Sequence, residues 1–543
     1  MRNKANTPFL LACIAIVIII SQIFGCASIQ HPTGGPRDSV APIIIDENPN
    51  NFTTNFNSGE INIEFDEYFK LANEYKEISF SPAMEKAPQF KTKKKVLNIE
   101  FQEPLEANTT YTINFGKAIA DYNEGNVLKN YMYVFSTGDK IDSLSISGTV
   151  RNTLTKEPVL DATVFILPVN QDSLFGKKRA SIFTSTDSSG NFSLKYLKEN
   201  TYNIYALLEK GGDKIYNSTN EQIGFINSPI VLKKDTSGIN LEIFNEEPQN
   251  LRVTDRKIEK DGRITFVFNK SLIDPSLEIL QPAELNSTKI VEFNTLRDTA
   301  FLWTESLEFD SINVAIQDTQ RNLDTVIIRR NKRDTYNREL AISDNISSAR
   351  LKPGADVVLT LSAPIKNIDG RKFSLLQDSV PVTGLRVSRD SLSQRKIYLK
   401  YPWREEKQYS LSIAEEGFTG TFGGTNKAYS KQFHRDTDDN YGFLSLVVTV
   451  PDTSKSYIVQ LLSEQDKVID RVVLNKNTAL NFPTMSIGRY YVRVVYDENK
   501  NDKWDTGNVL TRTQPEKVWN FEKEISLRAN FDIEQEIVIP KPQ

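Results

Sequence analysis

The segment 497–507 carries the side chains whose types and spacing are best suited to chemistry. Asp497, Asn499, Asn501 and Asp505 place carboxylate or amide oxygens at alternating positions, directly after an apolar run. Oxygens that converge in a tight loop can bind a hard cation, and Ca²⁺ takes roughly six to eight such ligands. The alternative is a hairpin rich in Asp and Asn, whose side chains accept hydrogen bonds from their own backbone. The spacing leaves both interpretations open.

The same segment resembles the calcium loops of EF-hand and dockerin-like proteins. The resemblance implies that Lys503 offers its carbonyl oxygen as a further ligand. Two positions depart from that pattern, because Asp502 replaces the glycine of the turn and Asn508 replaces the bidentate glutamate. At the equivalent place earlier in the chain, the stretch 209–216 lacks most of these ligands.

Cys26 is the second chemically distinctive residue, because it follows an almost unbroken apolar run from Phe9 to Phe24. Arg2 and Lys4 precede this run, an arrangement typical of an export signal. A plain transmembrane anchor is the alternative, but the run is shorter than the roughly 20 apolar residues that a membrane span needs. Several acyl chains on one cysteine would hold a protein permanently to a bilayer.

The stretch 23–26 resembles the lipobox of bacterial lipoproteins, although Phe24 stands where a small residue is usual. The resemblance implies cleavage after Gly25 and lipidation of Cys26. Ala27 follows the cysteine, which resembles sorting to the outer membrane. The acidic cluster that marks surface export in some Bacteroidetes-type lipoproteins is not present there. We therefore expect a lipid anchor in the outer membrane, with the periplasm-facing orientation favoured over the cell surface.

Composition excludes several classes of function. The chain of 543 residues has a formal net charge of −4, so it offers no strong field for nucleic acid. His31 and His434 are its only histidines, which removes most histidine-based metal sites and general bases. Cys13 lies in the export signal, so the mature chain cannot form an intramolecular disulfide. No Gly-x-Ser-x-Gly motif is present. We predict that the protein is not an enzyme and needs no cofactor except, in one interpretation, Ca²⁺.

Three further features have structural explanations that compete with a binding role. The basic run 329–333 is typical of a solvated strand end, and the alternative is a phosphate or glycan site. Trp403 and Trp519 are the aromatic residues whose exposure would favour glycan binding, since sugars stack on open aromatic faces. The lysine-rich stretch 91–95 is suited to protecting an exposed strand edge.

Alternation of apolar and polar residues predicts strands along the whole chain. In 61–65, 97–101 and 111–115 every second residue is apolar, which places one face of each strand in a core. Strands of this length, separated by loops rich in Asn, Gly, Pro and Lys, predict β-sandwiches. The stretch 41–138 resembles the bacterial Ig-like domains of S-layer proteins and lipoproteins.

Two kinds of sandwich are expected. The stretch 145–245, with its turn from Asp187 to Gly190, resembles the carboxypeptidase-regulatory, transthyretin-like module, which has no catalytic residues of its own. The final stretch 442–540 resembles it again. Pro402 precedes Tyr409 by the interval that separates Pro104 from Tyr111, which indicates a duplicated Ig-like unit.

The predicted fold is all-β, with tandem Ig-like and transthyretin-like β-sandwich domains behind a lipoprotein signal peptide. The predicted segments are a signal peptide at 1–25, a tether at 26–42, Ig-like domains at 43–140, 248–338 and 340–440, and transthyretin-like domains at 145–245 and 442–540.

These features predict a non-enzymatic, membrane-anchored envelope lipoprotein that acts as a structural or interaction scaffold. Its expected partners are the bilayer, through Cys26, and an envelope protein or glycan, but not nucleic acid. The alternative is a glycan- or protein-binding accessory of a surface nutrient-uptake or adhesion system, which needs an exposed aromatic or basic patch. A hydrolase would need carboxylates gathered in a pocket with shifted pKa values.

Overall fold

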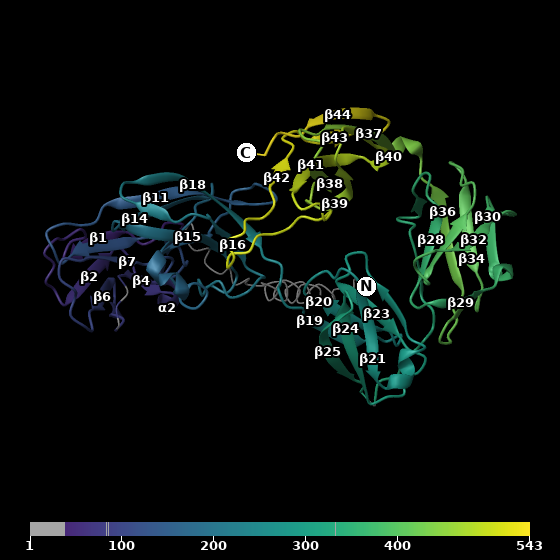
Figure 1. Ribbon diagram of the computed structural model, residues 1–543, viewed down its shortest axis with the longest axis horizontal. Helices are drawn as coiled ribbons and strands as arrows, with labels where there is room; N and C mark the ends of the chain where they lie inside the picture. The colour runs from purple at the N-terminus through teal and green to yellow at the C-terminus, as the bar shows by residue number, and fades with distance from the viewer. Residues whose placement is uncertain (1–37, 83, 85, 332, 543) are drawn as a thin grey trace, which may run out of the picture. The chain divides into compact units, whose positions relative to one another are not determined.

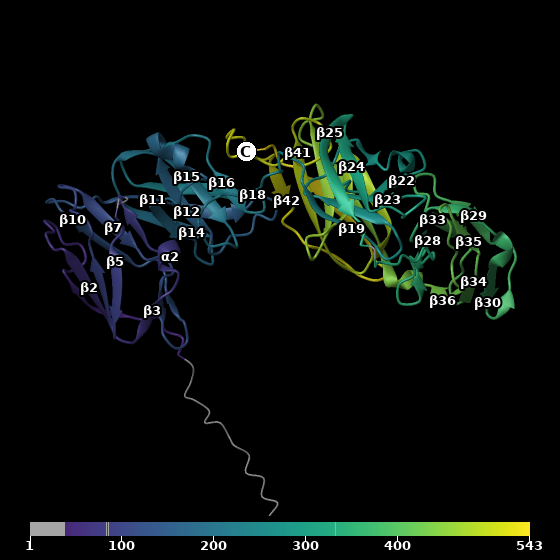
Figure 2. The same ribbon diagram turned by 90° about the horizontal axis from the view of Figure 1, so that it is seen from below.

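The structure is a computed structural model that describes residues 38–542 except 83, 85 and 332. Strands dominate this part of the chain, and its helical elements are one single-turn α-helix and four short 3-10 helices (Figures 1 and 2). The strands form β-sandwiches around five principal hydrophobic cores. The prediction of an all-β fold is therefore confirmed. The first sandwich belongs to a compact unit that ends at Ile141, and the other four belong to a second unit that begins at Asp142.

The first sandwich, residues 44–136, shows how alternation builds a core. Strands β2 and β6 pair antiparallel, so that Ile61 faces Ile99 and Ile63 faces Leu97, and all four side chains are fully buried. Its sheets have the orders β1-β2-β6-β5, β10-β7-β4 and β3-β8-β9. The elements are β1 (Ile44–Asn48), β2 (Glu60–Phe65), β3 (Phe69–Leu71), α2 (Glu74–Glu77), β4 (Ser79–Ser81), β5 (Gln89–Lys93), β6 (Val96–Glu100), β7 (Thr110–Asn114), β8 (Ile119–Asp121), β9 (Val127–Leu128) and β10 (Met132–Ser136).

The second sandwich, residues 144–245, has a mixed sheet in which β11 runs parallel to β18 and antiparallel to β14. The predicted turn before β14 is present, with Gly190 at φ +76° and its N–H donating to the carbonyl of Asp187. The elements are β11 (Leu144–Asn152), β12 (Thr163–Pro168), η1 (Val169–Leu174), β13 (Ile182–Ser185), β14 (Asn191–Leu197), β15 (Asn200–Leu208), β16 (Gln222–Phe225), β17 (Ile230–Leu232) and β18 (Thr236–Asn245).

The fifth sandwich, residues 441–538, repeats this pairing except between the strands that correspond to β16 and β18. Its first strand, β37, runs parallel to β44 and antiparallel to β40, and β41 pairs with β38, β42 and β43 as β15 pairs with β12, β16 and β17. The elements are β37 (Tyr441–Thr449), β38 (Ser456–Ser463), β39 (Val468–Leu474), β40 (Thr478–Ser486), β41 (Gly488–Asp497), β42 (Val518–Asn520), β43 (Ile525–Leu527) and β44 (Asp532–Val538), with η4 (Asp438–Asn440) before them.

The third sandwich, residues 253–329, is built of two sheets with the orders β19-β20-β23-β22 and β21-β24-β25. Figure 2 shows β24 beside β25. The elements are β19 (Val253–Ile258), β20 (Ile264–Phe268), β21 (Pro275–Gln281), η2 (Ala283–Asn286), β22 (Ile290–Phe293), β23 (Thr299–Trp303), β24 (Ser311–Asp318) and β25 (Arg321–Arg329).

The fourth sandwich, residues 342–435, shares a local device with the first. The hydroxyl of Tyr111 accepts a hydrogen bond from the N–H of Glu106 at 2.8 Å, and that of Tyr409 accepts one from the N–H of Arg404 at 2.7 Å. The equal Pro–Tyr intervals therefore accompany the same contact. The elements are β26 (Ile342–Asp344), β27 (Arg350–Leu351), β28 (Val357–Leu361), β29 (Ile365–Ile368), η3 (Gly370–Lys372), β30 (Phe373–Gln377), β31 (Val380–Pro381), β32 (Arg386–Arg389), β33 (Lys396–Lys400), β34 (Gln408–Ile413), β35 (Phe418–Gly420) and β36 (Tyr429–Arg435).

Candidate functional site

The four predicted calcium ligands lie together at the end of β41. Asp497 is buried, and its carboxylate accepts hydrogen bonds from the backbone N–H groups of Asn501 and Asp502, at 3.1 and 3.2 Å. Asn499 and Asn501 both donate from their side-chain Nδ2 to Oδ2 of Asp505, the second at 2.7 Å. The turn is tight enough that Asp502, at the predicted glycine position, has a φ of +62°.

This arrangement fits a calcium site only in part. The two Asn side chains present N–H donors to Asp505, so both amides would have to rotate before their oxygens could meet a cation. The backbone N–H groups already occupy the carboxylate of Asp497. Among the described residues no group of three or more His, Cys, Asp or Glu is placed to hold a metal. The predicted set consists of two Asp and two Asn. Calcium binding therefore stays a prediction.

The chain that follows Asp497, residues 498–517, includes this turn and crosses from the fifth sandwich to the second, and we call it the docking loop. In Figure 1 it is the yellow segment that reaches the strand labelled β16. Val509 is 5% exposed and packs with Phe225 and Phe244 of the second sandwich. Its backbone N–H donates to the carboxylate of Glu246, which lies 263 residues earlier in the chain. The contact thus joins two modules that are far apart in the sequence.

Arg512 adds a polar anchor to the docking loop. Its guanidinium donates to the carbonyl of Ile226 at 3.1 Å and to the hydroxyl of Tyr205 at 2.8 Å, and it lies 5.6 Å from the centre of the Tyr205 ring. The Tyr205 hydroxyl in turn donates to Asp172 at 2.7 Å. Burial, together with that hydrogen bond, raises the pKa of Tyr205, so the phenol stays protonated and can both donate and accept.

Gly507 allows the close approach of the two modules. A Cβ atom at this position would lie 2.5 Å from the Phe244 ring and 2.6 Å from the carbonyl oxygen of Thr513. A second contact lies at the base of the loop, where Leu154 of the second sandwich packs on Ile458 and Val495 of the fifth. The loop is therefore fastened at both its tip and its base.

Glu516 lies near the end of the docking loop and binds residues near its start. Its carboxylate accepts hydrogen bonds from the backbone N–H groups of Glu498 at 2.8 Å and of Asp505 at 3.0 Å, and its carbonyl accepts one from the indole of Trp504. Burial raises the pKa of the Glu516 carboxyl, and the two N–H donors oppose that shift. The predicted calcium segment thus shares its closing contact with the docking loop.

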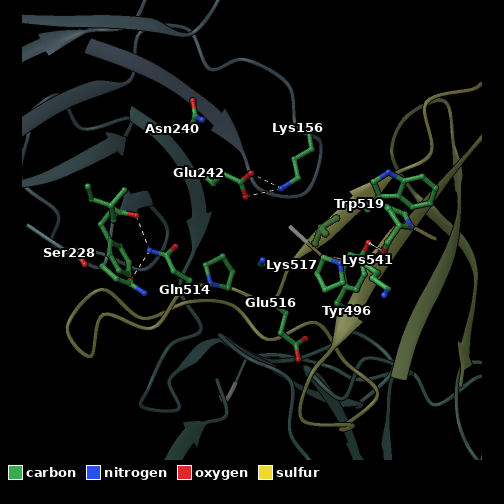
Figure 3. A pocket seen from close by; sticks show the side chains of 17 residues that line it. Lys156, Ser228, Asn240, Glu242, Tyr496, Gln514, Glu516, Lys517, Trp519 and Lys541 are labelled. Carbon is green, nitrogen blue, oxygen red and sulfur yellow. Dashed lines mark hydrogen bonds and ion pairs between the residues drawn. The ribbon is translucent and has the colours of Figure 1, made fainter. Parts of the chain in front are cut away.

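A cleft of about 930 Å³ lies between the docked second and fifth sandwiches (Figure 3). Lys156 and Glu242 form an ion pair at 2.7 Å on the wall of the second sandwich, while Trp519 and Lys541 lie on the wall of the fifth. Gln514 closes one end by donating to the carbonyl of Phe225 at 2.9 Å. The volume lies within the range of small-molecule and ligand clefts, roughly 300–1,000 Å³.

The cleft is open because of the one pairing that differs between the two related sandwiches. In the second sandwich β16 pairs with β18, with Gln222 opposite Asn245. Among the described strands of the fifth sandwich, β42 and β44 are not paired. The residues beside that opening, Trp519 on β42 and Pro540 after β44, line the cleft. The lining side chains include amides, ammonium groups, carboxylates and one half-buried indole. Such a set can bind a polar chain. Among these lining residues no nucleophile is paired with a base.

The two tryptophans flagged in the sequence differ in their surroundings. Trp403 is half-buried, and its ring contacts those of Tyr409 and Phe433 at 5.0 and 5.3 Å in the fourth sandwich, so it is part of a core. Trp519 is also half-buried and packs on the core of the fifth sandwich, with its ring 6.0 Å from that of Phe521, but it lines the cleft as well.

The remaining sequence candidates have structural roles or lie outside the described part. His434 lies within β36, where its backbone N–H donates to Ala349. In the basic run, Arg330 pairs with Glu308 at 3.1 Å at the end of the third sandwich. Cys26 and the apolar run before it lie outside the described residues. No helix in the described part is long and apolar enough to cross a membrane.

Comparisons with known proteins bear chiefly on the first sandwich. Residues 38–137 match the family model of the bacterial Ig-like domain, which confirms the likeness predicted for 41–138. A search of the curated proteins finds no match.

Several solved structures are similar over much of the chain. The TIE protein of Bacillus anthracis is 10% identical, with 93% of this chain and 76% of that chain covered and a TM-score of 0.14. The S-layer protein SbsC is 11% identical, with 90% and 68% covered and a TM-score of 0.15. SGBP-B of a Bacteroides ovatus mixed-linkage glucan utilization locus, in complex with a heptasaccharide, is 11% identical, with 62% and 87% covered and a TM-score of 0.18.

Proposed function

We propose that the chain is a non-enzymatic, membrane-anchored envelope lipoprotein that acts as an interaction scaffold and binds its partner in the cleft between the second and fifth sandwiches. The observation that carries the proposal is the docking of Val509 and Arg512 on the second sandwich. Docking holds the two cleft walls in place before a ligand arrives, and such preorganisation lowers the entropic cost of binding.

The proposal includes the finer expectations from the sequence. Acyl chains on Cys26 would anchor the chain in the outer membrane, with the modules facing the periplasm. The carboxypeptidase-regulatory likeness of 145–245 and 442–540 supports a role without catalysis, since such modules have no catalytic residues of their own. The likeness to Bacteroidetes-type lipoproteins belongs to the same proposal.

A second candidate function is a glycan- or protein-binding accessory of a nutrient-uptake or adhesion system. The observation that favours it is the position of Trp519 on the cleft wall, beside amide side chains such as Gln514. Indole rings offer a flat apolar face, and amides can donate to and accept from hydroxyl groups.

Photo-crosslinking in cells tests the proposal. A photoreactive residue at Lys541, in the cleft, is compared with one at the exposed Lys476 of the same sandwich. We expect a discrete adduct from position 541 alone. An adduct that a protease removes supports a protein partner, whereas one that periodate destroys supports the glycan accessory. Equal labelling from both positions, or none from either, would contradict binding in the cleft.

The anchor is tested separately by feeding cells labelled palmitate. We expect the full-length chain to carry the label and to sediment with membranes, and Cys26→Ser to lose both properties. A Cys26→Ser variant that still sediments with membranes in high salt would indicate an uncleaved transmembrane anchor instead.

A further inference from the structure

A groove with a strongly basic lining lies on the first sandwich. It has a volume of about 630 Å³ on the outward face of the β1-β2-β6-β5 sheet. The pairing register places Lys91 opposite Asn98 and Asn98 opposite Asn62, so these three side chains form a row across β5, β6 and β2. The alternate residues Leu97 and Ile99 are fully buried on the other face, which fixes the row toward solvent.

Four ammonium groups line this groove, on Lys91, Lys93, Lys94 and Lys95, against one lining carboxylate, on Glu64. Lys91 is paired with Glu100 at 2.6 Å, outside the lining set, and Lys95 donates to the carbonyl of Asp66. Lys93 and Lys94 are exposed and have no ion-pair partner among the described residues. Two charges of the groove are therefore available to a ligand.

Protection of the sheet edge explains only part of this arrangement. The structure confirms that β5 is an edge strand, and Lys91 and Lys93 on it would discourage pairing with another chain. Edge protection requires neither a hollow nor an aromatic ring, yet Tyr68 is 56% exposed at the groove with Lys95 Nζ 6.0 Å from its ring centre. In the fourth sandwich the corresponding edge strand β32 carries Arg389, whose guanidinium is already bonded to the carbonyls of Ile365 and Lys366.

We propose that this groove binds an acidic polysaccharide. Ammonium groups suit carboxylate or phosphate substituents, amide side chains suit hydroxyl groups, and the Tyr68 ring offers a face for a sugar ring. A hollow that crosses three strands accommodates a chain, whereas a flat membrane surface would contact protruding residues. Because the charges are exposed, binding depends on ionic strength. The proposal concerns the first sandwich alone and does not depend on the cleft.

The test uses the full chain in detergent micelles, with polygalacturonate as the acidic probe and dextran as the neutral probe, in affinity electrophoresis. We expect retention by polygalacturonate only, decreasing as salt is raised. Lys93→Gln with Lys94→Gln should weaken retention about fivefold to tenfold, since two exposed charge contacts are lost. Arg at both positions should restore it. The matched control is Lys233→Gln with Lys234→Gln, two exposed lysines of the second sandwich, which should leave retention unchanged.

A second variant separates binding from edge protection. Tyr68→Ala leaves β5 unchanged and should weaken retention about threefold by polygalacturonate but not by inorganic polyphosphate, which has no sugar ring. If the double Gln variant aggregates, the retention of Tyr68→Ala alone tests whether the groove binds the polysaccharide.

The probes also distinguish the possible anions. Retention by a poly(glycerol phosphate) with sugar substituents, in place of or beside polygalacturonate, supports the proposal and identifies which acid is bound. Equal retention of wild type and both variants, or equally strong binding to polyphosphate, DNA or phosphatidylglycerol vesicles, would overturn it.

Discussion

The second and fifth sandwiches share all but one of their strand pairings and use the loop after their fifth strand in different ways. In the second sandwich the loop after β15 closes on itself, because the carboxylate of Glu209 accepts hydrogen bonds from the N–H groups of Asp213 and Lys214. In the fifth, Asp497 closes a similar turn after β41, but the chain then extends to Val509 and docks on the other module.

This difference shows that the acidic turn and the long-range contact are separate devices. The turn is a local hydrogen-bonded cap that both sandwiches have. The reach of the docking loop, together with the unpaired β42 and β44, belongs to the fifth sandwich alone and creates both the contact and the cleft.

Among the substitutions that test the difference between the two sandwiches, Val509→Asp should have the largest effect on stability. A carboxylate at a 5% exposed site in an apolar cluster, next to the carboxylate of Glu246, would be costly to bury, so we expect undocking at a cost of about 3 kcal/mol or more in the free energy of unfolding. Limited proteolysis should then cut within the docking loop. Leu510→Asp is the control, because the neighbouring Leu510 is 75% exposed and should tolerate the change. Similar proteolysis of both variants would show that the loop is not held by Val509.

Gly507→Ala tests the close approach of the docking loop to the second sandwich by adding a single methyl group. The added Cβ would meet the Phe244 ring and the Thr513 carbonyl, and we expect a loss of about 1–3 kcal/mol, measured by thermal unfolding. At Gly370 an added Cβ meets nothing within 4 Å, so Gly370→Ala should leave the melting temperature nearly unchanged. An equal, small effect at both positions would contradict the close approach.

Adding Ca²⁺ tests whether the turn after β41 differs from the turn after β15 in metal binding as well as in length. If Asp497, Asn499, Asn501 and Asp505 bind Ca²⁺, the ion should stabilise the chain by about 2–3 kcal/mol at a hundredfold excess over its dissociation constant. The measurement is the melting temperature with Ca²⁺ and with a chelator. Asp505→Asn should abolish the response. If the melting temperature of the wild-type chain is the same with Ca²⁺ and with a chelator, the segment is a plain turn.

The smallest expected effect is a pH dependence at Glu516. Its pKa is raised in the folded state by burial, so the stability that it contributes is present below its ordinary value near 4.5 and is lost as the pH rises through the raised value. The difference in stability between Glu516→Gln and the wild type should therefore shift in favour of the variant as the pH rises above 4.5. Urea unfolding at several pH values measures it. A difference that is constant with pH would contradict the raised pKa.

The sequence predicts the sandwiches well because their signals are local. Alternation in 61–65 decides which face of β2 is buried, and the spacing of Pro104 and Tyr111 reports a contact between near neighbours. The docking contact gives no such signal. Val509 and Leu510 are adjacent apolar residues in a polar loop, and only the placement of the second sandwich decides that the first is buried and the second exposed.

The sequence predicts only those parts of the candidate site whose signals are local. The composition of 497–507 identifies an oxygen-rich turn, and calcium binding there stays a prediction. Trp403 and Trp519 both pack on a sandwich core, and Trp519 also lines the cleft. Arg512 was not identified, because its partners Tyr205 and Ile226 lie almost three hundred residues earlier.

That separation has a consequence for how the chain matures. Modules near the N-terminus are synthesised first and fold as units, so the second sandwich is complete long before residue 509 is delivered. Until then the part of the apolar cluster around Phe244 that the docking loop covers faces water. A chain that stops short of the docking loop keeps this surface exposed, which marks truncated copies for chaperones and proteases. This late contact thus distinguishes a chain that includes the docking loop from one that stops short of it.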